Sequence, residues 1–295
     1  MRAALIKLAH YPGPATLWSW VSHETHPGGA SIVRLTVDGI STFAGTGGRA
    51  FDPALPAILF LHGGGCDHTV WALLARWFAH RGHAVLAPDL PGHGRSGGDV
   101  LPSIGAMADW VAALIDASGA GKAGVVGHSM GALIALETAA RHPGRVAALA
   151  LIGAAAAMPV SRDLLAAAQA NDHASVDMVS IWGNGFRAGL GGSLVPGSWM
   201  VGCTARLLER MRPGVLFKDL AACNAYGDGL AAAAKVAAPA TLVLGERDLM
   251  TPHSGGMRLA AALPKARVVT LKAAGHMLMS ERPDEVLAAV RDFAA

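Results

Sequence analysis

The stretch AGVVGHSMG, at positions 123–131, decides the fold of this chain. Its first four residues have the small and apolar character of a buried strand, and a helical pattern runs from the following turn to about His142. Between them, residues 127–131 form G-x-S-x-G, a tight turn that directs Ser129 outward at the carboxyl end of a sheet. Glycines flank this turn because side chains there would collide with neighbouring backbone. The stretch therefore predicts a nucleophilic serine in an α/β fold.

Strand-like and helix-like segments alternate along the chain on both sides of this turn. Because such alternation implies parallel pairing through right-handed crossovers, we expect a mostly parallel eight-stranded sheet flanked by helices. The expected strands are Ser31–Val37, 40–44, Ala57–Leu61, 84–87, 123–126, Val146–Ile152, 241–244 and 267–271. The expected helices lie near 70–81, Ile104–Ser118, 131–142, 254–263 and 283–293.

The alternation stops between residues 154 and 237, a segment rich in Ala, Met, Trp and Gly. We interpret it as a mainly helical cap inserted into one core, whose two parts are residues 1–153 and 238–295. An insertion that leaves a strand at its carboxyl end would lie over Ser129. The segment carries a loop-like run at 183–197, of which residues 183–192 are expected to give the cap a mobile edge.

A serine hydroxyl needs a base, and thirteen histidines compete for that role. His276 follows a strand and precedes the last helix, which places it at the same sheet edge as Ser129. Asp248 follows the strand at 241–244 and is expected to orient the imidazole, with Glu246 as the rival carboxylate. Asp248 also lies between Ser129 and His276 in the chain, and the order Ser, Asp, His is the one that this architecture uses.

An oxyanion needs two aimed N–H donors. The amide of Met130, next to the nucleophile, is one candidate. The other should come from the glycine loop after the strand Ala57–Leu61, where we choose Gly64 over its neighbours Gly63 and Gly65.

At this point the chain resembles the α/β-hydrolase superfamily over residues 57–152 and 240–295. The family's oxyanion motif is matched by LHGGG at 61–65, and its turn after the next strand by DLPGHGRS at 89–96. The resemblance implies that the second of these loops is structural, with Asp89 and Ser96 satisfying a tight turn, and that His62 braces the oxyanion loop. Relatives that use Asp as nucleophile are disfavoured by Ser129.

The cap should supply the walls of an apolar pocket, and we expect Trp182, Phe186 and Met277 to contact substrate. The sequence contains no HExxH, no histidine pair at metal-ligand spacing, no phosphate loop and no dinucleotide fingerprint. We therefore expect no metal site and no cofactor, and a small-molecule ester as the substrate.

Composition narrows the partners of the chain. Hydrophobic residues make up 52% and charged residues 15%, with a formal net charge of +3 and no basic cluster, so we expect no nucleic-acid partner. Apolar runs are too short for a membrane span, Lys7 interrupts the only signal-peptide candidate, and three cysteines lack CxxC spacing. These features favour a soluble cytoplasmic protein with reduced thiols. The sequence does not choose between a monomer and a homodimer.

These observations favour a carboxylesterase that forms an acyl-enzyme on Ser129. The resemblance also leaves open a carbon–carbon bond hydrolase of ring-cleavage products, an enol-lactonase, and a cofactor-free peroxidase-like activity with the same triad. From a different class, a ligand-binding receptor on the same fold is disfavoured by the intact triad.

Overall fold

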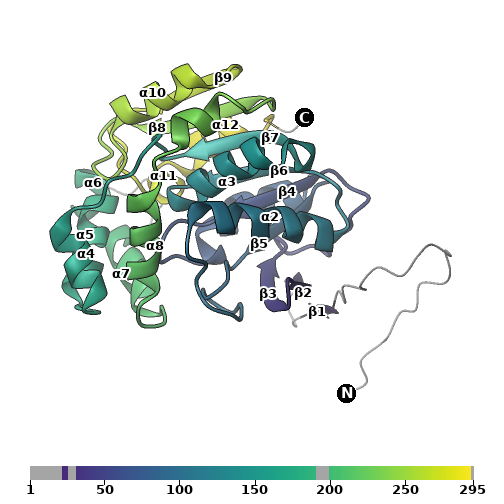
Figure 1. Cartoon of the computed structure of the whole chain (residues 1–295), viewed down its shortest axis with the longest axis horizontal. Coiled ribbons are helices and arrows are strands. Elements are labelled where there is room, and N and C mark those ends of the chain that lie inside the picture. The colour runs from purple at the N-terminus through teal and green to yellow at the C-terminus, as the bar shows by residue number, and fades with distance from the viewer. Residues whose placement is uncertain (1–21, 26–30, 191–198, 294–295) are drawn as a thin grey trace.

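A computed structural model describes residues 22–25, 31–190 and 199–293 (Figure 1). The segment considered above for a signal peptide lies outside the described residues, and so do residues 191–197 of the loop-like run. The expected mostly parallel sheet with flanking helices is confirmed. Its strands are β2 (Ser31–Val37), β3 (Ile40–Gly45), β4 (Ala57–Leu61), β5 (Ala84–Pro88), β6 (Ala123–His128), β7 (Val146–Ile152), β8 (Ala240–Gly245) and β9 (Ala266–Leu271).

A short ninth strand, β1 (Ser22–Thr25), extends the edge of the expected eight-stranded sheet by pairing antiparallel with β2. The strand order is β1-β2-β3-β5-β4-β6-β7-β8-β9. All neighbours from β5 through β9 in this order are parallel, whereas β1, β2 and β3 pair antiparallel. The parallel strands are buried on both faces, which explains their continuous apolar sequences.

Alternate residues of the central strands supply two hydrophobic cores, one on each face of the sheet, because strand side chains point to opposite faces in turn. In β4, Leu59 and Leu61 pack with α2 (Ile104–Ser118) and α3 (Met130–Arg141), whereas Ile58 and Phe60 pack with α1 (Ala72–Ala79) and α12 (Pro283–Val290). The helix α10 (His253–Ala262) adds Leu259 to the first core. The sheet is therefore held rigidly between two helical layers.

The insertion between β7 and β8 is helical, as expected. Its helices are α4 (Arg162–Gln169), α5 (Ala174–Gly183), α6 (Phe186–Gly189), α7 (Met200–Glu209), α8 (Val215–Ala225) and α9 (Gly229–Ala233). Figure 1 shows α4, α5, α7 and α8 grouped at one end of the molecule. Leu164, Ala168, Leu216 and Leu220 form a small core of their own.

The last helix of the insertion packs against the hydrolase core. In α9, Ala232 and Ala233 belong to the core shared with α3, and a Cβ on Gly229 would lie 1.9 Å from the carbonyl oxygen of Ala156. The domain boundary at 237 stays a prediction, since this packing joins the end of the insertion to the hydrolase core.

Several element ends differ from expectation. The helix expected at 70–81 is divided into a 3-10 turn η1 (His68–Trp71), capped by Asp67, and α1, while α12 ends at Val290 instead of 293. A short helix α11 (Leu278–Glu281) and the helix α6 were not expected. Within the described residues, no helix is both long and apolar enough to cross a bilayer.

Candidate active site

Ser129 lies on a strained turn between β6 and α3. Its φ of 54° and ψ of −120° are rare for a residue with a side chain, and such strain is common at functional sites. The turn is possible because both flanking residues are glycines. A Cβ on Gly127 would lie 2.1 Å from the carbonyl oxygen of Gly131, and one on Gly131 would lie 2.2 Å from that of Leu61. The partly exposed Ser129 thus stands at the carboxyl end of β6.

Asp248 lies in the loop after β8 and is 5% exposed. Its Oδ1 accepts the N–H groups of Met250 and Thr251, and its Oδ2 accepts the Thr251 hydroxyl at 2.7 Å. Burial alone would raise the pKa of Asp248, but His276 and these donors lower it below its usual value. The carboxyl group is therefore held ionised at neutral pH.

The structure brings His276 and Asp248 together, as the sequence predicts. Nδ1 of His276 lies 2.8 Å from Oδ2 of Asp248, and the imidazole is 3% exposed. Because a carboxylate can only accept, Nδ1 carries the hydrogen and Nε2 is left as a base. Among the hydrogen bonds of the described residues, none joins Ser129 Oγ to His276. In hydrolases this hydrogen bond is often long without substrate and shortens only when substrate binds. The rival Glu246 instead accepts the N–H of Ala273.

The glycine loop after β4 runs past the nucleophile. A Cβ on Gly63 would lie 3.3 Å from Cβ of Ser129. The N–H of Gly65 donates to Oδ2 of Asp219 at 2.7 Å, which leaves Gly63 and Gly64 as the candidate donors of this loop. In the described part of the chain, the N–H groups of Gly64 and Met130 have no backbone partner.

His62 supports the glycine loop from behind. Its Nε2 accepts the N–H of Leu90 at 3.1 Å, and its Nδ1 donates to the carbonyl oxygen of Gly63 at 2.9 Å. Burial of the ring, followed by the nearby His93, lowers the pKa of His62 to about 4. A neutral ring with one donor and one acceptor matches both contacts, as expected for a brace.

The loop at 89–96 is a hydrogen-bonded turn. Oδ2 of Asp89 accepts the N–H of Arg95 at 2.8 Å, and the hydroxyl of Ser96 donates to the carbonyl oxygen of Asp89 and accepts the N–H of Phe43. A Cβ on Gly94 would lie 2.3 Å from Oδ2 of Asp89, so only glycine fits there. These contacts agree with the structural role that the sequence predicts.

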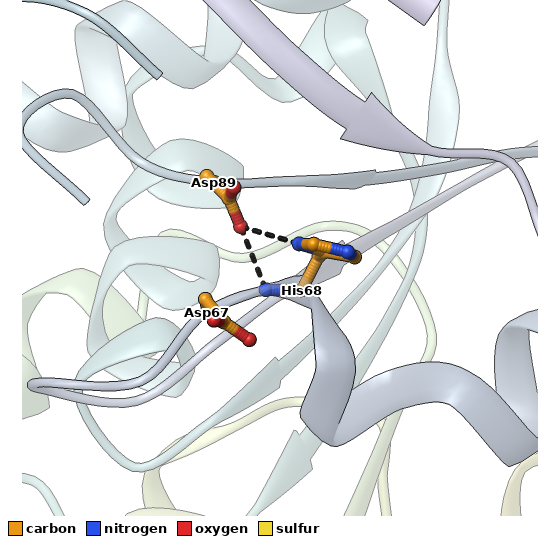
Figure 2. Close-up of side chains that lie close together, drawn as sticks. All are labelled: Asp67, His68 and Asp89. Atoms are coloured by element: carbon orange, nitrogen blue, oxygen red, sulfur yellow. Dashed lines mark hydrogen bonds and ion pairs between the residues drawn. The ribbon is translucent and has the colours of Figure 1, made fainter. Parts of the chain in front are cut away.

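Asp67, His68 and Asp89 place three metal-type donor atoms within 4.8 Å of one another (Figure 2). Oδ1 of Asp89 already accepts the N–H and the Nδ1 hydrogen of His68, as the dashed lines in Figure 2 show. Asp67 accepts from the N–H of Thr69 and pairs with Arg210 across 2.9 Å. These contacts explain the cluster as a loop brace, and we assign no metal to it.

Two residues that sequence reasoning missed hold the His276 loop. Nε2 of His128 donates to the carbonyl oxygen of His276 at 2.9 Å, and Oε2 of the buried Glu281 accepts the N–H of Gly275 at 2.9 Å. Burial, followed by the neighbouring His276, lowers the pKa of His128 to about 3, so its ring is neutral. The place of His128 beside Ser129 in G-x-S-x-G could have drawn attention to it; Glu281 carries no such signal.

The cap is tied to the same loop. The carbonyl oxygen of Gly183, at the end of α5, accepts the N–H groups of His276 at 3.1 Å and Met277 at 2.8 Å. Gly185 donates its N–H to the Glu281 carboxylate. The first residues of the run that we expected to be mobile are therefore anchored to the loop that carries His276.

The three expected substrate contacts lie in different settings. Met277 is buried and lines a hollow of about 430 Å³ under α7, together with Trp199 and Met200. Trp182 packs against the small core of the insertion, whereas Phe186 is 75% exposed. Ser129 is not among the residues that line this hollow, and contacts of all three residues with substrate stay predictions.

The three cysteines are free: Cys66 and Cys223 are buried, and Cys203 is exposed. Burial, followed by the negative charge of Asp67, raises the pKa of Cys66 to about 12, and burial also raises the pKa of Cys223. A buried thiol with a raised pKa is a poor nucleophile, so neither residue competes with Ser129.

Comparison with known proteins places the chain in a family. Residues 56–283 match the family model described as alpha/beta hydrolase fold. The chain is 34% identical over 229 residues to a pimeloyl-[acyl-carrier protein] methyl ester esterase of Chromobacterium violaceum, which covers 75% of this chain and 87% of the relative. An esterase of the same name from Xanthomonas campestris is 30% identical over 249 residues, with 81% and 95% covered.

Solved structures agree with this placement. The enol-lactonase from Burkholderia xenovorans LB400 superposes with a TM-score of 0.78 at 25% identity, covering 88% of this chain and 98% of that one. A thermophilic esterase gives a TM-score of 0.72 at 25% identity, covering 89% and 96%. Because the family model spans more than half of the sequence and the sheet, turn and insertion agree with it, this chain belongs to the α/β-hydrolase fold family.

Proposed function

We propose that the protein is a serine hydrolase that cleaves carboxylic esters of small to medium apolar substrates through an acyl-enzyme on Ser129. The observation that carries the proposal is the 2.8 Å contact between Nδ1 of His276 and Asp248, beside a serine on a strained turn. This contact places the hydrogen of the neutral imidazole on Nδ1 and so directs Nε2 to act as the general base. Relatives named as methyl ester esterases support the same reaction class.

The reaction follows from these roles. Ser129 Oγ attacks the ester carbonyl carbon and passes its proton to Nε2 of His276, while the carbonyl oxygen becomes an oxyanion held by the N–H groups of Met130 and Gly64. The ester C–O bond then breaks, and His276 gives its proton to the departing alcohol. Water repeats the sequence on the acyl-enzyme, which releases the acid and restores Ser129. No cofactor takes part in these steps.

Fluorophosphonate labelling tests the nucleophile. We expect the probe to modify Ser129 in the native protein, and Ser129→Ala to abolish both labelling and hydrolysis of p-nitrophenyl esters. The exposed Ser254, on α10, provides a matched control, since Ser254→Ala should keep full activity. Labelling of another serine, or full esterase activity in Ser129→Ala, would overturn the proposal.

An ester panel of graded acyl length tests the substrate class. We propose that the acyl group extends from Ser129 toward the hollow of about 430 Å³ beside Met277, and we therefore expect the highest kcat/KM for short to medium acyl chains. Methyl esters of straight-chain acids belong in the panel, given the names of the relatives. A steady rise in kcat/KM up to long acyl chains would contradict this assignment.

The second candidate is an enol-lactonase, favoured by the similarity to the Burkholderia xenovorans enzyme. An enol-lactone would be opened by the same attack on a carbonyl, so the two activities differ only in the shape of the pocket. Adding an enol-lactone and a vinylogous diketone to the panel separates esterase, lactonase and carbon–carbon hydrolase activities. If compounds of the panel bind but none is hydrolysed, the protein is instead a ligand-binding receptor.

A further inference from the structure

A buried pair, His93 and Asp219, joins the cap to the glycine loop beside the proposed nucleophile. Asp219 lies on the cap helix α8 and is 0% exposed, and His93 lies on the loop after β5 and is 2% exposed. Nε2 of His93 is 2.8 Å from Oδ2 of Asp219. The same oxygen accepts the N–H of Gly65 at 2.7 Å. One carboxylate oxygen thus meets two donors from two different core loops.

The contacts of His93 determine its protonation. Its Nδ1 lies 3.0 Å from the carbonyl oxygen of Pro91, which can only accept, so Nδ1 carries a hydrogen. Its Nε2 faces a carboxylate, which requires a second hydrogen. Burial alone would lower the pKa of His93, but the charge and hydrogen bond of Asp219 raise it overall. His93 is therefore an imidazolium paired with a buried carboxylate.

The peptides on both sides of Gly64 are fixed by these groups. The carbonyl oxygen of Gly63 accepts from Nδ1 of His62 at 2.9 Å and from the N–H of Cys66 at 3.1 Å. Because N–H and C=O point in opposite directions across a trans peptide, the N–H of Gly64 points away from these two donors. Asp219 then fixes the next peptide plane through the N–H of Gly65, and its Cβ is 3.3 Å from where a Cβ of Gly64 would stand.

The second oxygen of Asp219 is evidence against a purely stabilising role. Among the described residues, Oδ1 of Asp219 is buried and has no hydrogen-bond partner. Burying a charged pair in this way contributes little to folding, and an unpartnered oxygen costs free energy. The contacts of Asp219 that remain are those of its other oxygen, which holds Gly65 and His93 in place.

We propose that Asp219 and His93 are positioning residues that hold the glycine loop so that the N–H of Gly64 faces the developing oxyanion, which makes assembly of the oxyanion hole depend on the seating of the cap helix α8. The inference rests on the proposed serine hydrolase function. It assigns a role in the reaction to a cap residue that does not touch the substrate.

Asp219→Asn is the first test. Asn keeps an oxygen that could accept from both Gly65 and His93, but it lacks the charge that stabilises the imidazolium, and it places an NH2 group where Oδ1 lies buried without a partner. The contacts that hold the glycine loop are therefore weakened. We expect kcat to fall on the order of tenfold to a hundredfold, which is less than the loss of a whole oxyanion donor, while KM changes by less than about threefold. Rates are expressed per active site titrated with a fluorophosphonate.

Inhibition by phenylboronic acid separates positioning from simple stabilisation. The boronate adds to the serine and places a hydroxyl in the oxyanion hole, so its Ki should rise by the same factor by which kcat/KM falls. Tyr226→Phe is the matched control, since Tyr226 also joins the insertion to the core, by a 2.6 Å hydrogen bond to Glu137 far from the glycine loop. This control should keep kcat within about twofold. A folded Asp219→Asn enzyme with unchanged kcat and boronate Ki would overturn the proposal.

Two further measurements decide the matter if Asp219→Asn does not fold. His93→Ala leaves the Asp219 charge unpaired and should lower kcat. His93→Gln restores an N–H donor and should recover most of the lost kcat. Native-like kcat in both variants would overturn the proposal. In the native protein at pH 7, histidine ¹⁵N spectra should show both nitrogens of His93 protonated. A neutral His93 would also overturn it. Failure of the hydrolase proposal looks different, because the native enzyme itself would then neither hydrolyse the panel nor be labelled at Ser129.

Discussion

The backbone at Ser129 has a left-handed φ of 54°, and the close approach of Gly127 and Gly131 to neighbouring carbonyl oxygens makes this conformation possible. Because the constraint is steric, the pentapeptide between a buried strand and a helix predicts where the serine stands, although one of the clashing carbonyl oxygens belongs to the distant Leu61. Asp248 and His276 could be predicted from their places after strands β8 and β9. The support given by His128 could not, since its partner is the carbonyl oxygen of a residue 148 positions away.

Gly127→Ala should damage the turn severely. The added Cβ would lie 2.1 Å from the carbonyl oxygen of Gly131, and backbone cannot move aside as a flexible side chain can. We expect a loss of unfolding free energy of about 3 kcal/mol or more and a large loss of kcat, measured by urea denaturation and ester hydrolysis. Gly144→Ala, at a position with open space around it, serves as the control and should change neither quantity.

Thr251→Val tests the support of Asp248. Valine keeps the N–H that donates to Oδ1 but removes the hydroxyl that donates to Oδ2 at 2.7 Å. Because that hydroxyl helps to lower the pKa of Asp248, the variant should have a higher Asp248 pKa and a kcat reduced by about tenfold, the usual effect of losing a hydrogen bond to a charged group. Restoration by Thr251→Ser is expected. An unchanged kcat in Thr251→Val would show that the two N–H donors suffice.

At the scale of elements, the main strands and long helices follow the expected alternation because buried apolar runs and helical periodicity are strong signals. The short elements η1, α6 and α11 have only four residues each, too few to show a period. The insertion at 154–237 could be predicted because the alternation stops there. Its attachment through Gly183 and Asp219 depends on backbone groups and distant partners that leave no pattern in the sequence.

Glu281 tests the link between the cap and the His276 loop. Glu281→Ala leaves the N–H groups of Gly275 and Gly185 without their acceptor, which should cost about 1–3 kcal/mol of unfolding free energy and lower kcat. Burial raises the pKa of Glu281, so the folded state disfavours its charge. Glu281→Gln keeps an acceptor without that charge and should be as stable as the native protein at pH 7 in urea denaturation. Equal stability of both variants would show that the link carries no energy.

At the scale of the whole molecule, neutral buried histidines set the response to acid. The pKa values of His62 and His128 are lowered to about 4 and about 3, whereas in the unfolded chain both would take up a proton near pH 6.5. The unfolded state therefore binds more protons below that pH. The free energy of unfolding should fall as the pH decreases from about 6.5 toward 4, by about 1.4 kcal/mol per pH unit for each histidine.

The paired His93 does not offset this loss. Its pKa is raised in the folded state, so its contribution is fully present below the unfolded pKa and is lost only as the pH rises through the folded value. Urea denaturation at pH 7 and pH 5 measures the effect, and His128→Gln should reduce the difference between the two. A profile that is flat between these pH values would contradict the assignment of two neutral histidines. The cytoplasmic location stays a prediction, and both a monomer and a homodimer remain compatible with the sequence.

The attachment of α8 through Asp219 has a consequence for building chimeras of this enzyme. An insertion transplanted from another hydrolase would bring its own pocket walls, but it would leave the imidazolium of His93 and the amide of Gly65 facing no carboxylate unless Asp219 were copied with it. Chimeras that lack this carboxylate should fold but show little hydrolysis at Ser129. Those that keep a single acidic side chain in register with both loops should retain turnover while exchanging substrate preference.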